Sequence, residues 1–191
     1  QLVGDKRGHM VVDFCAGAGG KTLALGAMMS NQGRLYAFDI SAKRLERLKP
    51  RLKRSGLSNV QTQLIGSEKD PRIQRLSGKI DRVLIDAPCS GLGTLRRNPD
   101  MKWRQAETDI VSMTDKQLRI LNSASKLVKK DGLLIYATCS ILRDENESVI
   151  ERFMIEHQGK FELIDAAKSL GIEGIDSSNT VSYTHLRAHE T

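Results

Sequence analysis

The sequence has few aromatic residues and no long apolar run. Phe, Trp and Tyr make up only 4% of its 191 residues, which argues against a protein that binds single-stranded nucleic acid by stacking bases on an aromatic platform. No segment approaches the roughly 18 consecutive apolar residues that a membrane-spanning helix needs, and the N-terminal residues lack the pattern of a signal peptide. We therefore expect no association with a membrane.

Cysteine and acidic residues are also limited. The three cysteines are an odd number, and without a sign of secretion they predict free thiols in a reducing, cytoplasmic compartment. Lys and Arg total 30 against 23 Asp and Glu, which gives a net charge of +7. This excess favours a polyanionic partner, with RNA or DNA first. The 39% hydrophobic and 28% charged residues exclude a disordered or fibrous protein.

Short apolar runs rich in β-branched residues alternate with longer amphipathic stretches along the chain. This alternation is typical of an α/β fold with a doubly wound, mostly parallel sheet. We expect strands at residues 10–15, 35–39, 60–65, 81–86, 133–137 and 161–164. We expect helices over residues 21–29, from Ser41 with a kink or break at Pro50, from Thr114 or Asp115 to Lys129 and Lys130, and from Asp144.

The pattern weakens near the C-terminus. From about Gly171 the periodicity stops, and residues 181–191 show no pattern that would pair them with the core. We expect one domain over residues 1–170, an irregular or foreign tail over residues 171–191, and a sheet that lacks its last strand.

A glycine-rich turn follows the first predicted strand. Gly17, Gly19 and Gly20 would let a ligand approach the backbone closely, and Asp39 ends the second strand about 20 residues further on. In open α/β sheets ligands bind beyond the carboxyl ends of the strands, where an acid at this offset binds ribose hydroxyls. The turn therefore favours an adenosine-type cofactor. The alternative is that the glycines only form a tight turn and Asp39 only caps the next helix.

The residues around the turn narrow the choice of cofactor. The spacing is Gly-x-Gly-Gly rather than Gly-x-Gly-x-x-Gly, which disfavours a dinucleotide. Asp13, before the glycines, suits a cationic amino acid group, which favours S-adenosylmethionine. Lys21 could equally serve a phosphate.

All three cysteines close a predicted strand or follow one. We expect Cys15 to be a small buried apolar residue. Cys89 and Cys139 lie in polar loops, and if their strands are neighbours they face a common crevice beside the cofactor.

A thiol beside a methyl donor has a specific chemical use. Addition of a thiolate to carbon 6 of a pyrimidine makes carbon 5 nucleophilic, and a base must later remove the proton from carbon 5. Asp86 could bind the exocyclic amine and N3 of cytosine. This chemistry alone does not choose between Cys89 and Cys139 as the nucleophile.

Three segments resemble motifs I, IV and VI of the RsmB/NOP family of RNA (cytosine-5) methyltransferases: residues 13–22 (DFCAGAGGKT), 86–91 (DAPCSG) and 137–140 (ATCS). Residues 96–103 and 144–147 also resemble this family, and the resemblance spans roughly residues 2–165. It implies a Rossmann-like class I methyltransferase fold with S-adenosylmethionine as cofactor. It further implies that Cys139 is the covalent nucleophile, that Cys89 assists proton removal and product release, and that Asp86 binds the cytosine.

The resemblance also implies a set of cofactor contacts, namely Cys15, Ala16, Gly17, Ala18, Gly19, Gly20, Lys21, Asp39 and Asp86. A further contact in the family falls on an acid after the third strand, where this sequence has Gly66, Ser67 and Glu68, and we place it at Ser67. The sequence departs from the family in two respects. We expect the family's N-terminal RNA-binding module and its final Gly-Phe-Phe strand to be absent.

A basic loop follows the second motif. Arg96, Arg97, Lys102 and Arg104 surround Trp103 and could hold RNA phosphates while Trp103 packs a base. The alternative is a solvated loop with Trp103 as its local core. We interpret the basic run at residues 43–54 as a solvated helix face.

The leading hypothesis is an RNA (cytosine-5) methyltransferase that acts on ribosomal RNA, with transfer RNA left open. We expect a cytoplasmic monomer without a metal site. The alternatives are a nicotinamide-dependent oxidoreductase and a non-catalytic RNA-binding fragment.

Overall fold

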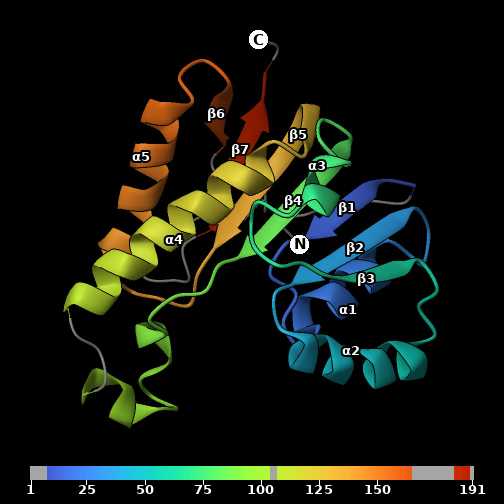
Figure 1. Ribbon diagram of the computed structural model, residues 1–191, viewed down its shortest axis with the longest axis horizontal. Helices are drawn as coiled ribbons and strands as arrows, with labels where there is room; N and C mark the ends of the chain where they lie inside the picture. Colours follow the sequence, from blue (N-terminus) through green and yellow to red (C-terminus); the bar gives the residue numbers. More distant parts are fainter. Residues whose placement is uncertain (1–7, 104–106, 165–182, 190–191) are drawn as a thin grey trace, which may run out of the picture.

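Figure 1 shows the protein as a computed structural model, which describes residues 8–103, 107–164 and 183–189. In these residues a seven-stranded sheet has the order β3-β2-β1-β4-β5-β7-β6. Strands β1 to β5 are parallel to their neighbours, whereas β7 runs antiparallel to both β5 and β6. The strands are β1 Met10–Asp13, β2 Arg34–Asp39, β3 Val60–Leu64, β4 Ile80–Asp86, β5 Val128–Ala137, β6 Phe161–Ile164 and β7 Tyr183–Ala188.

Helices cover both faces of the sheet (Figure 1). The α-helices are α1 Gly20–Met28, α2 Ala42–Ser55, α3 Pro71–Gln74, α4 Glu107–Ser125 and α5 Glu147–Glu156, and the short 3₁₀ helices are η1 Leu92–Thr94, η2 Pro99–Trp103 and η3 Arg143–Glu145. Because successive strand residues point to opposite faces, Val11 packs with Leu25 of α1 while Val12 belongs to the core that contains Leu121 of α4. The predicted doubly wound, mostly parallel fold is confirmed.

Helix α2 differs from its prediction at Pro50. The helix continues without a break from Ala42 to Ser55, and the Ser41 hydroxyl accepts a hydrogen bond from the Arg44 amide as the expected cap. Leu45 and Leu48 before the proline and Leu52 after it pack into the same apolar cluster. Packing on both sides of Pro50 therefore holds the segment as one helix despite the missing N–H donor.

The α4–β5 region corrects two further predictions. Helix α4 begins at Glu107 rather than at Thr114 or Asp115. The apolar pattern does not reveal its first turns, because they bury little and leave Val111 62% exposed. The helix also ends at Ser125, so Lys129 and Lys130 do not cap it but belong to β5. Lys129 forms an ion pair with Asp81 of β4 at the point where the β4–β5 register shifts.

The C-terminal strand is a larger correction. The sequence pattern predicts an irregular tail and a sheet without its last strand, yet Tyr183–Ala188 forms β7 between β5 and β6. Leu186 is fully buried and joins the main core with Ala188. The predictions of an irregular tail and of a missing last strand are therefore wrong for Tyr183–Ala188. The hypothesis of a foreign origin concerns the ancestry of the segment and stays a prediction.

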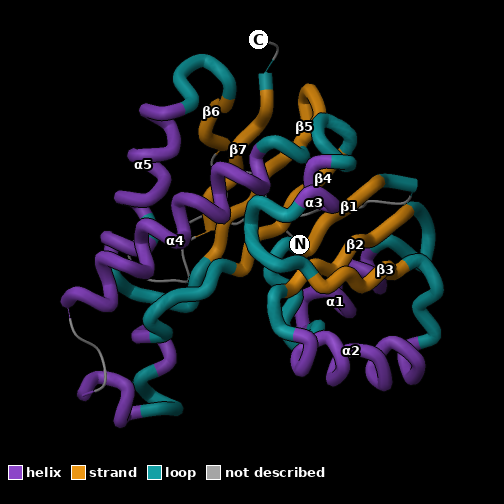
Figure 2. The backbone as a smooth tube through the Cα atoms, viewed as in Figure 1, coloured by secondary structure: helices purple, strands orange, loops and turns teal. Residues whose placement is uncertain are grey.

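Part of the connection from β4 to α4 extends away from the sheet. Figure 2 shows the turns of η1 and η2 projecting below the sheet, beyond the carboxyl ends of β4 and β5. None of the helices in the described ranges has the length and apolar character needed to cross a membrane.

Candidate active site

The carboxyl ends of β1 to β4 surround a cavity of about 970 Å³. Parallel strands bring the loops that follow them to one edge of the sheet, which is where ligands bind in folds of this type. The loops after the four strands and one side of α4 form the wall. The lining residues are Phe14, Cys15, Ala16, Gly17, Ala18, Gly20, Lys21, Asp39, Ile40, Ser41, Arg44, Ile65, Gly66, Ser67, Glu68, Asp86, Pro88, Cys89, Met113, Lys116 and Ile120.

Asp39 joins the glycine turn to the end of β2. Its carboxylate accepts hydrogen bonds from the Gly17 amide at 2.8 Å and from the Ser41 amide at 2.7 Å. Gly17 has a φ of 57°, a left-handed conformation that favours glycine. The acid therefore fixes the turn and also lines the cavity, so the structural and ligand-binding interpretations of Asp39 are compatible.

Gly19 is the one glycine of the predicted contacts that does not line the cavity. A Cβ atom built on it would lie 2.0 Å from Leu48 Cδ1, and its φ is 86°. This glycine is needed because helix α2 packs directly against the turn.

The loop after β3 lines the far side of the cavity with Gly66, Ser67 and Glu68. Glu68 forms an ion pair with Arg119 of α4 at 3.3 Å. Asp70 turns away from the cavity and braces the loop, because its carboxylate accepts from the Gly66 amide at 2.8 Å and from the Arg72 side chain. These hydrogen bonds hold the pKa of Asp70 well below its usual range.

Asp13 corrects a prediction. Its place before the glycines predicts that it faces a cationic ligand, but it is fully buried, and it accepts a hydrogen bond from Thr22 Oγ1 at 2.7 Å beneath α1 rather than lining the cavity. Within the described residues its other oxygen, Oδ1, has no hydrogen-bond partner. Burial, with the nearby carboxylates Asp86 and Asp39, raises its pKa from 3.8 to about 7.

The structure brings Cys89 and Cys139 into direct contact. Cys89 follows β4 and Cys139 follows β5, and because these strands are parallel neighbours the two Sγ atoms lie 3.1 Å apart. Both thiols are free, and Cys139 is exposed. The Gly93 amide donates to the Cys139 carbonyl at 2.9 Å, and a Cβ on Gly93 would come within 2.5 Å of that oxygen. The site needs glycine there.

The sulfur contact gives the two thiols different acidities. The hydrogen bond from Cys89 lowers the pKa of Cys139 to about 7. The same bond, together with burial, raises the pKa of Cys89 well above its usual range. Cys139 is thus the thiol that exists as a thiolate near neutral pH, and only the thiolate is strongly nucleophilic.

Asp86 and Lys21 provide the charged groups beside the thiols. Lys21 Nζ lies 2.6 Å from Asp86 Oδ2, and both side chains remain partly exposed at 42% and 37%. A carboxylate held in this way can still accept hydrogen bonds from a ligand in the cavity.

Cys15 is part of the cavity wall and packs in part against the core. It is half-buried, and burial raises the pKa of its thiol far above the usual range. It therefore stays protonated, but it is half-buried in the cavity wall rather than fully buried as the sequence predicts.

Sequence reasoning missed the buried polar residues behind the two cysteine loops. Glu145 accepts from the Ser90 amide at 2.7 Å, from the Ser90 hydroxyl and from the Gln117 amide group at 3.0 Å. Asn146 donates to the Ser140 carbonyl at 3.0 Å. The sequence shows Glu145 as one of several acids at a helix start, in the segment 144–147 that resembles the family, but nothing in the pattern separates it from its exposed neighbours.

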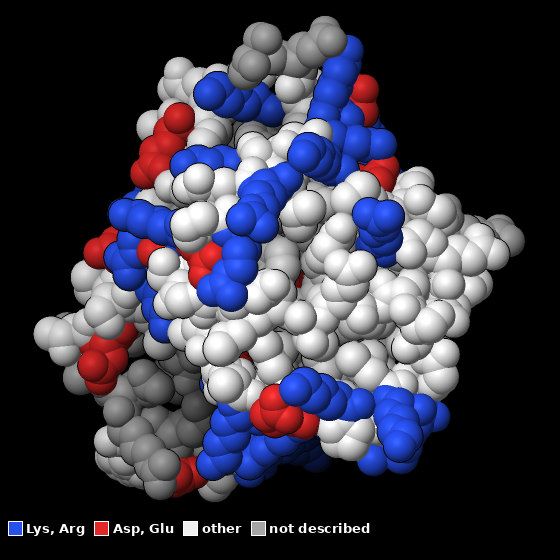
Figure 3. All heavy atoms as spheres, turned by 45° about the vertical axis from the view of Figure 1, so that its right-hand side comes forward, with Lys and Arg blue, Asp and Glu red and all other residues white. Residues whose placement is uncertain are grey.

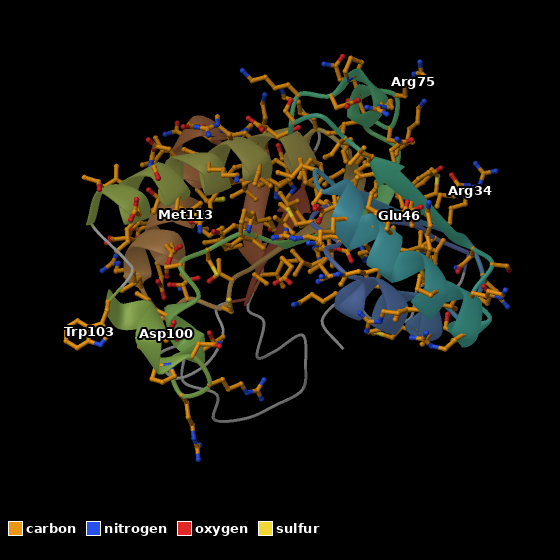
Figure 4. All side chains as sticks on the ribbon, turned by 60° about the horizontal axis from the view of Figure 1, so that its bottom comes forward. Arg34, Glu46, Arg75, Asp100, Trp103 and Met113 are labelled. Atoms are coloured by element: carbon orange, nitrogen blue, oxygen red, sulfur yellow. The ribbon has the colours of Figure 1, made fainter. Side chains whose placement is uncertain are left out.

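The predicted RNA-binding residues lie on the β4–α4 excursion. Arg96 and Arg97 are exposed. Trp103 is 81% exposed and points away from the protein body in Figure 4, so it is not the local core of this loop. Arg104 lies outside the described residues, as does the side chain of Lys102.

The basic run at residues 43–54 follows helix α2. Figure 3 shows Lys and Arg side chains gathered along the lower edge of that face of the molecule, where α2 lies, with an acidic side chain among them. The interpretation of this run as an exposed helix face is consistent with that view.

A model of the family described as 16S rRNA methyltransferase RsmB/F matches residues 2–188. The chain belongs to the RsmB/F methyltransferase family. This membership confirms the resemblance that the three motifs indicated.

Individual relatives agree with this membership. The RsmB/F chain is 38% identical over 158 residues to a probable ribosomal RNA small subunit methyltransferase B of Synechocystis sp., a match that covers 83% of this chain and 35% of the relative. It is 38% identical over 157 residues to ribosomal RNA small subunit methyltransferase B of Photorhabdus laumondii, covering 82% of this chain and 36% of the relative. The chain thus spans about a third of the length of these relatives.

The fold of the RsmB/F chain is also similar to solved structures. The crystal structure of PH0851 superposes with a TM-score of 0.83 at 35% identity and covers 99% of this chain and 44% of that one. A methyltransferase homologue from Pyrococcus horikoshii gives a TM-score of 0.75 at 28% identity, covering 98% of this chain and 64% of that one.

The pKa of Asp13 makes a prediction about stability. Because the folded-state pKa, about 7, exceeds the ordinary 3.8, the folded protein holds this proton longer than the unfolded chain does. The contribution of Asp13 to the free energy of unfolding is therefore most favourable below pH 3.8, and it is lost as the pH rises towards 7. We expect Asp13→Asn to gain stability relative to the wild type across this window, by at most about 1.4 kcal/mol per pH unit. Urea unfolding at several pH values measures it, and parallel pH profiles of the two proteins would contradict it.

The sulfur contact makes a prediction about reactivity. We expect the alkylation rate of Cys139 by iodoacetamide to rise with a midpoint near pH 7, the value to which its pKa is lowered. Cys89→Ala removes the hydrogen-bond donor, so the midpoint moves towards the ordinary cysteine pKa of about 8.5 and the rate at pH 7 falls roughly tenfold.

The alkylated residue is identified by peptide mass spectrometry, and Cys15→Ala serves as the control thiol variant with an unchanged midpoint. An unshifted midpoint in Cys89→Ala would show that the contact does not set the acidity of Cys139.

Proposed function

We propose that this chain is the catalytic domain of an S-adenosylmethionine-dependent RNA (cytosine-5) methyltransferase that acts on ribosomal RNA. The observation that carries the proposal is the 3.1 Å contact between Cys139 and Cys89, of which Cys89 lines the cavity. Methylation of an amine or a hydroxyl needs no thiol, whereas methylation of carbon 5 of a pyrimidine needs a thiolate that adds and a group that lets it leave.

The cavity suits the proposed cofactor. When bound, S-adenosylmethionine supplies the electrophilic methyl group. Asp39 would accept hydrogen bonds from the ribose hydroxyls, because it lines the cavity and each carboxylate oxygen can accept more than one hydrogen bond. Ile40 and Ile65 provide apolar surface for an adenine ring beside Ser67. The turn from Cys15 to Lys21, apart from Gly19, forms the remaining wall for the amino acid end.

Asp86 and Lys21 would hold the target base. The Asp86 carboxylate accepts hydrogen bonds from the exocyclic amine and, once N3 is protonated, from N3 of a cytosine extruded from the RNA. The Lys21 ammonium lies 2.6 Å from that carboxylate and would help to orient it towards the base. Asp86 also lines the cavity, so the base and the cofactor would meet at the end of β4.

Cys139 would act as the nucleophile. Its thiolate adds to carbon 6 and forms a carbon–sulfur bond, which places electron density on carbon 5. The lowered pKa of about 7 keeps a large fraction of this thiol ionised at neutral pH, and its exposure leaves it accessible to RNA.

Cys89 would assist release of the product. After methylation, solvent water takes the proton from carbon 5, and the electron pair of that bond re-forms the carbon 5–carbon 6 double bond as the bond to Cys139 breaks. Cys89 lies beside the departing sulfur and can return its own hydrogen bond to the restored thiolate. The raised pKa of Cys89 suits the donor rather than the nucleophile.

The choice of ribosomal RNA follows the names of the relatives, which are ribosomal RNA small subunit methyltransferases. We place the protein in the cytoplasm, where both thiols stay reduced. A nicotinamide-dependent oxidoreductase would use the same sheet edge but would have no use for the two thiols. A non-catalytic RNA-binding fragment would have no need of an ionised Cys139.

Trapping on modified RNA tests the proposal. Fluorine at carbon 5 cannot leave as a proton would, so 16S rRNA fragments that contain 5-fluorocytidine should retain the covalent bond to Cys139 in the presence of S-adenosylmethionine. We expect a slowly migrating protein–RNA band on denaturing gels with the wild type and none with Cys139→Ala.

Cys89→Ala is the matched variant. With unmodified RNA it should accumulate the adduct, because addition proceeds while release slows. Equal trapping by the wild type and Cys139→Ala would overturn the assignment of the nucleophile.

The exposed arginines give an independent prediction. Arg96→Glu with Arg97→Glu should weaken RNA binding and reduce the steepness of its salt dependence by about one unit of log–log slope for each phosphate that the variant no longer binds. Filter binding over a range of salt concentrations measures both quantities. Reversal of charge at Arg54, on the far end of α2, is the control, and an unchanged slope in the double variant would argue against contact with RNA phosphates.

A further inference from the structure

Two consecutive buried polar residues lie behind the cysteine loops, where η3 meets α5. Glu145 is fully buried and Asn146 is 4% exposed. Buried polar side chains are costly unless their hydrogen-bonding groups are paired. Their partners therefore indicate what this junction holds in place.

Glu145 holds the loop that contains Cys89. Its Oε1 accepts from the backbone amide of Ser90 at 2.7 Å, and its Oε2 accepts from the Ser90 hydroxyl. Gln117 of α4 donates to the same Oε1 at 3.0 Å and to the Pro88 carbonyl at 2.9 Å. The residues on both sides of Cys89 are thus tied, directly or through Gln117, to one carboxylate.

Asn146 holds the loop that contains Cys139. Its Oδ1 accepts from Thr138 Oγ1 at 2.5 Å, and its Nδ2 donates to the carbonyls of Ser140 at 3.0 Å and Leu142 at 2.8 Å. Thr138 and Ser140 flank Cys139 directly. Adjacent residues of one junction therefore hold the two loops whose sulfur atoms touch.

A chain of hydroxyl groups joins the two loops to each other. Ser90 Oγ lies 3.2 Å from Ser140 Oγ, and the Leu142 amide donates to Ser140 Oγ at 3.1 Å. A carboxylate only accepts, so the Ser90 hydroxyl donates to Glu145 and the Ser140 hydroxyl must donate to Ser90. The carboxylate thus gives the chain a single direction, from the Cys139 loop to the Cys89 loop.

We propose that Glu145 is a positioning residue that sets the separation of the Cys89 and Cys139 sulfur atoms through Ser90 and Ser140. The inference deepens the proposed function and rests on it for the roles of the two thiols. Glu145 touches neither thiol and acts only through the loops. A hydrogen bond weakens steeply as its geometry departs from the optimum, so release of either loop lowers the ability of Cys89 to stabilise the Cys139 thiolate.

The isosteric variant Glu145→Gln tests this role. The glutamine retains an oxygen that accepts from the Ser90 backbone amide and from the Gln117 side chain. It places an NH₂ donor where the second carboxylate oxygen accepts from the Ser90 hydroxyl. The Ser90 hydroxyl must then donate to the Ser140 hydroxyl. The Ser140 hydroxyl can no longer donate to Ser90, so its hydrogen is left without an acceptor and the link between the two loops weakens. We expect the pH midpoint of Cys139 alkylation by iodoacetamide to rise and the rate at pH 7 to fall roughly tenfold.

Two further variants make the result specific. Glu147→Gln is the matched control, since Glu147 is exposed two residues along the chain, and its alkylation profile should equal that of the wild type. Ser90→Ala removes the hydroxyl link but keeps the backbone amide that donates to Glu145. It should raise the pH midpoint of Cys139 alkylation, as Glu145→Gln does. If Glu145→Gln does not fold, Ser90→Ala serves as the test of the proposal.

A wild-type alkylation profile in folded Glu145→Gln, or in Ser90→Ala if the former is unfolded, would overturn the proposal. The measurement uses the whole chain and needs no RNA. A shifted profile in the variants together with no trapping of RNA by the wild type would therefore refute the methyltransferase mechanism while leaving the positioning role intact.

Discussion

The parallel pairing of β4 with β5 is the constraint on which the candidate site depends. Parallel neighbours end at the same edge of the sheet about 4.8 Å apart, and the register aligns Asp86 with Ala137. Cys89 lies three residues after Asp86, and Cys139 lies two residues after Ala137. The sulfur atoms of two cysteines that are distant in sequence are therefore 3.1 Å apart. An antiparallel arrangement would place the loops that follow these strands at opposite edges.

Three aspartates at the same edge show how local partners separate residues of one type. Asp13 lies beneath α1, where burial raises its pKa to about 7. Asp39 accepts hydrogen bonds from the Gly17 amide of the glycine turn and from the Ser41 amide after β2, and Asp86 is paired with Lys21. The first supports the turn from below, the second shapes the cavity, and the third remains partly exposed beside the thiols. Their different surroundings, rather than their positions at strand ends, decide which of them can meet a ligand.

Local patterns are sufficient to predict much of the fold. The apolar runs around Val12 and Ile85 predict buried strands, and the parallel topology then places the loops after them together. Features that depend on distant partners are not predictable in this way. Gly19 is explained only by the packing of Leu48, and Glu145 only by Ser90, which is 55 positions away.

The errors share this cause. The prediction that Asp13 faces a ligand fails because the sequence shows its place before the glycines but not the position of Thr22, to which it is bonded. Residues 183–188 carry no strong apolar alternation, yet the unpaired edges of β5 and β6 give them a place in the sheet. An unpaired strand edge can bind a segment without alternating apolar residues, because the hydrogen bonds between strands are made by backbone N–H and C=O groups and not by side chains.

The contact between the thiols also explains how two identical side chains can have different roles. A single S–H···S hydrogen bond holds one proton, so it stabilises the anion on one sulfur and opposes ionisation of the other. Cys139 is the more exposed of the pair, and the contact lowers its pKa while it raises the pKa of the more buried Cys89. The chemistry of cysteine alone is symmetric, and burial on one side breaks that symmetry. A thiolate at the surface with a hydrogen-bond donor behind it suits addition to the pyrimidine and the later departure of the same sulfur from the methylated product.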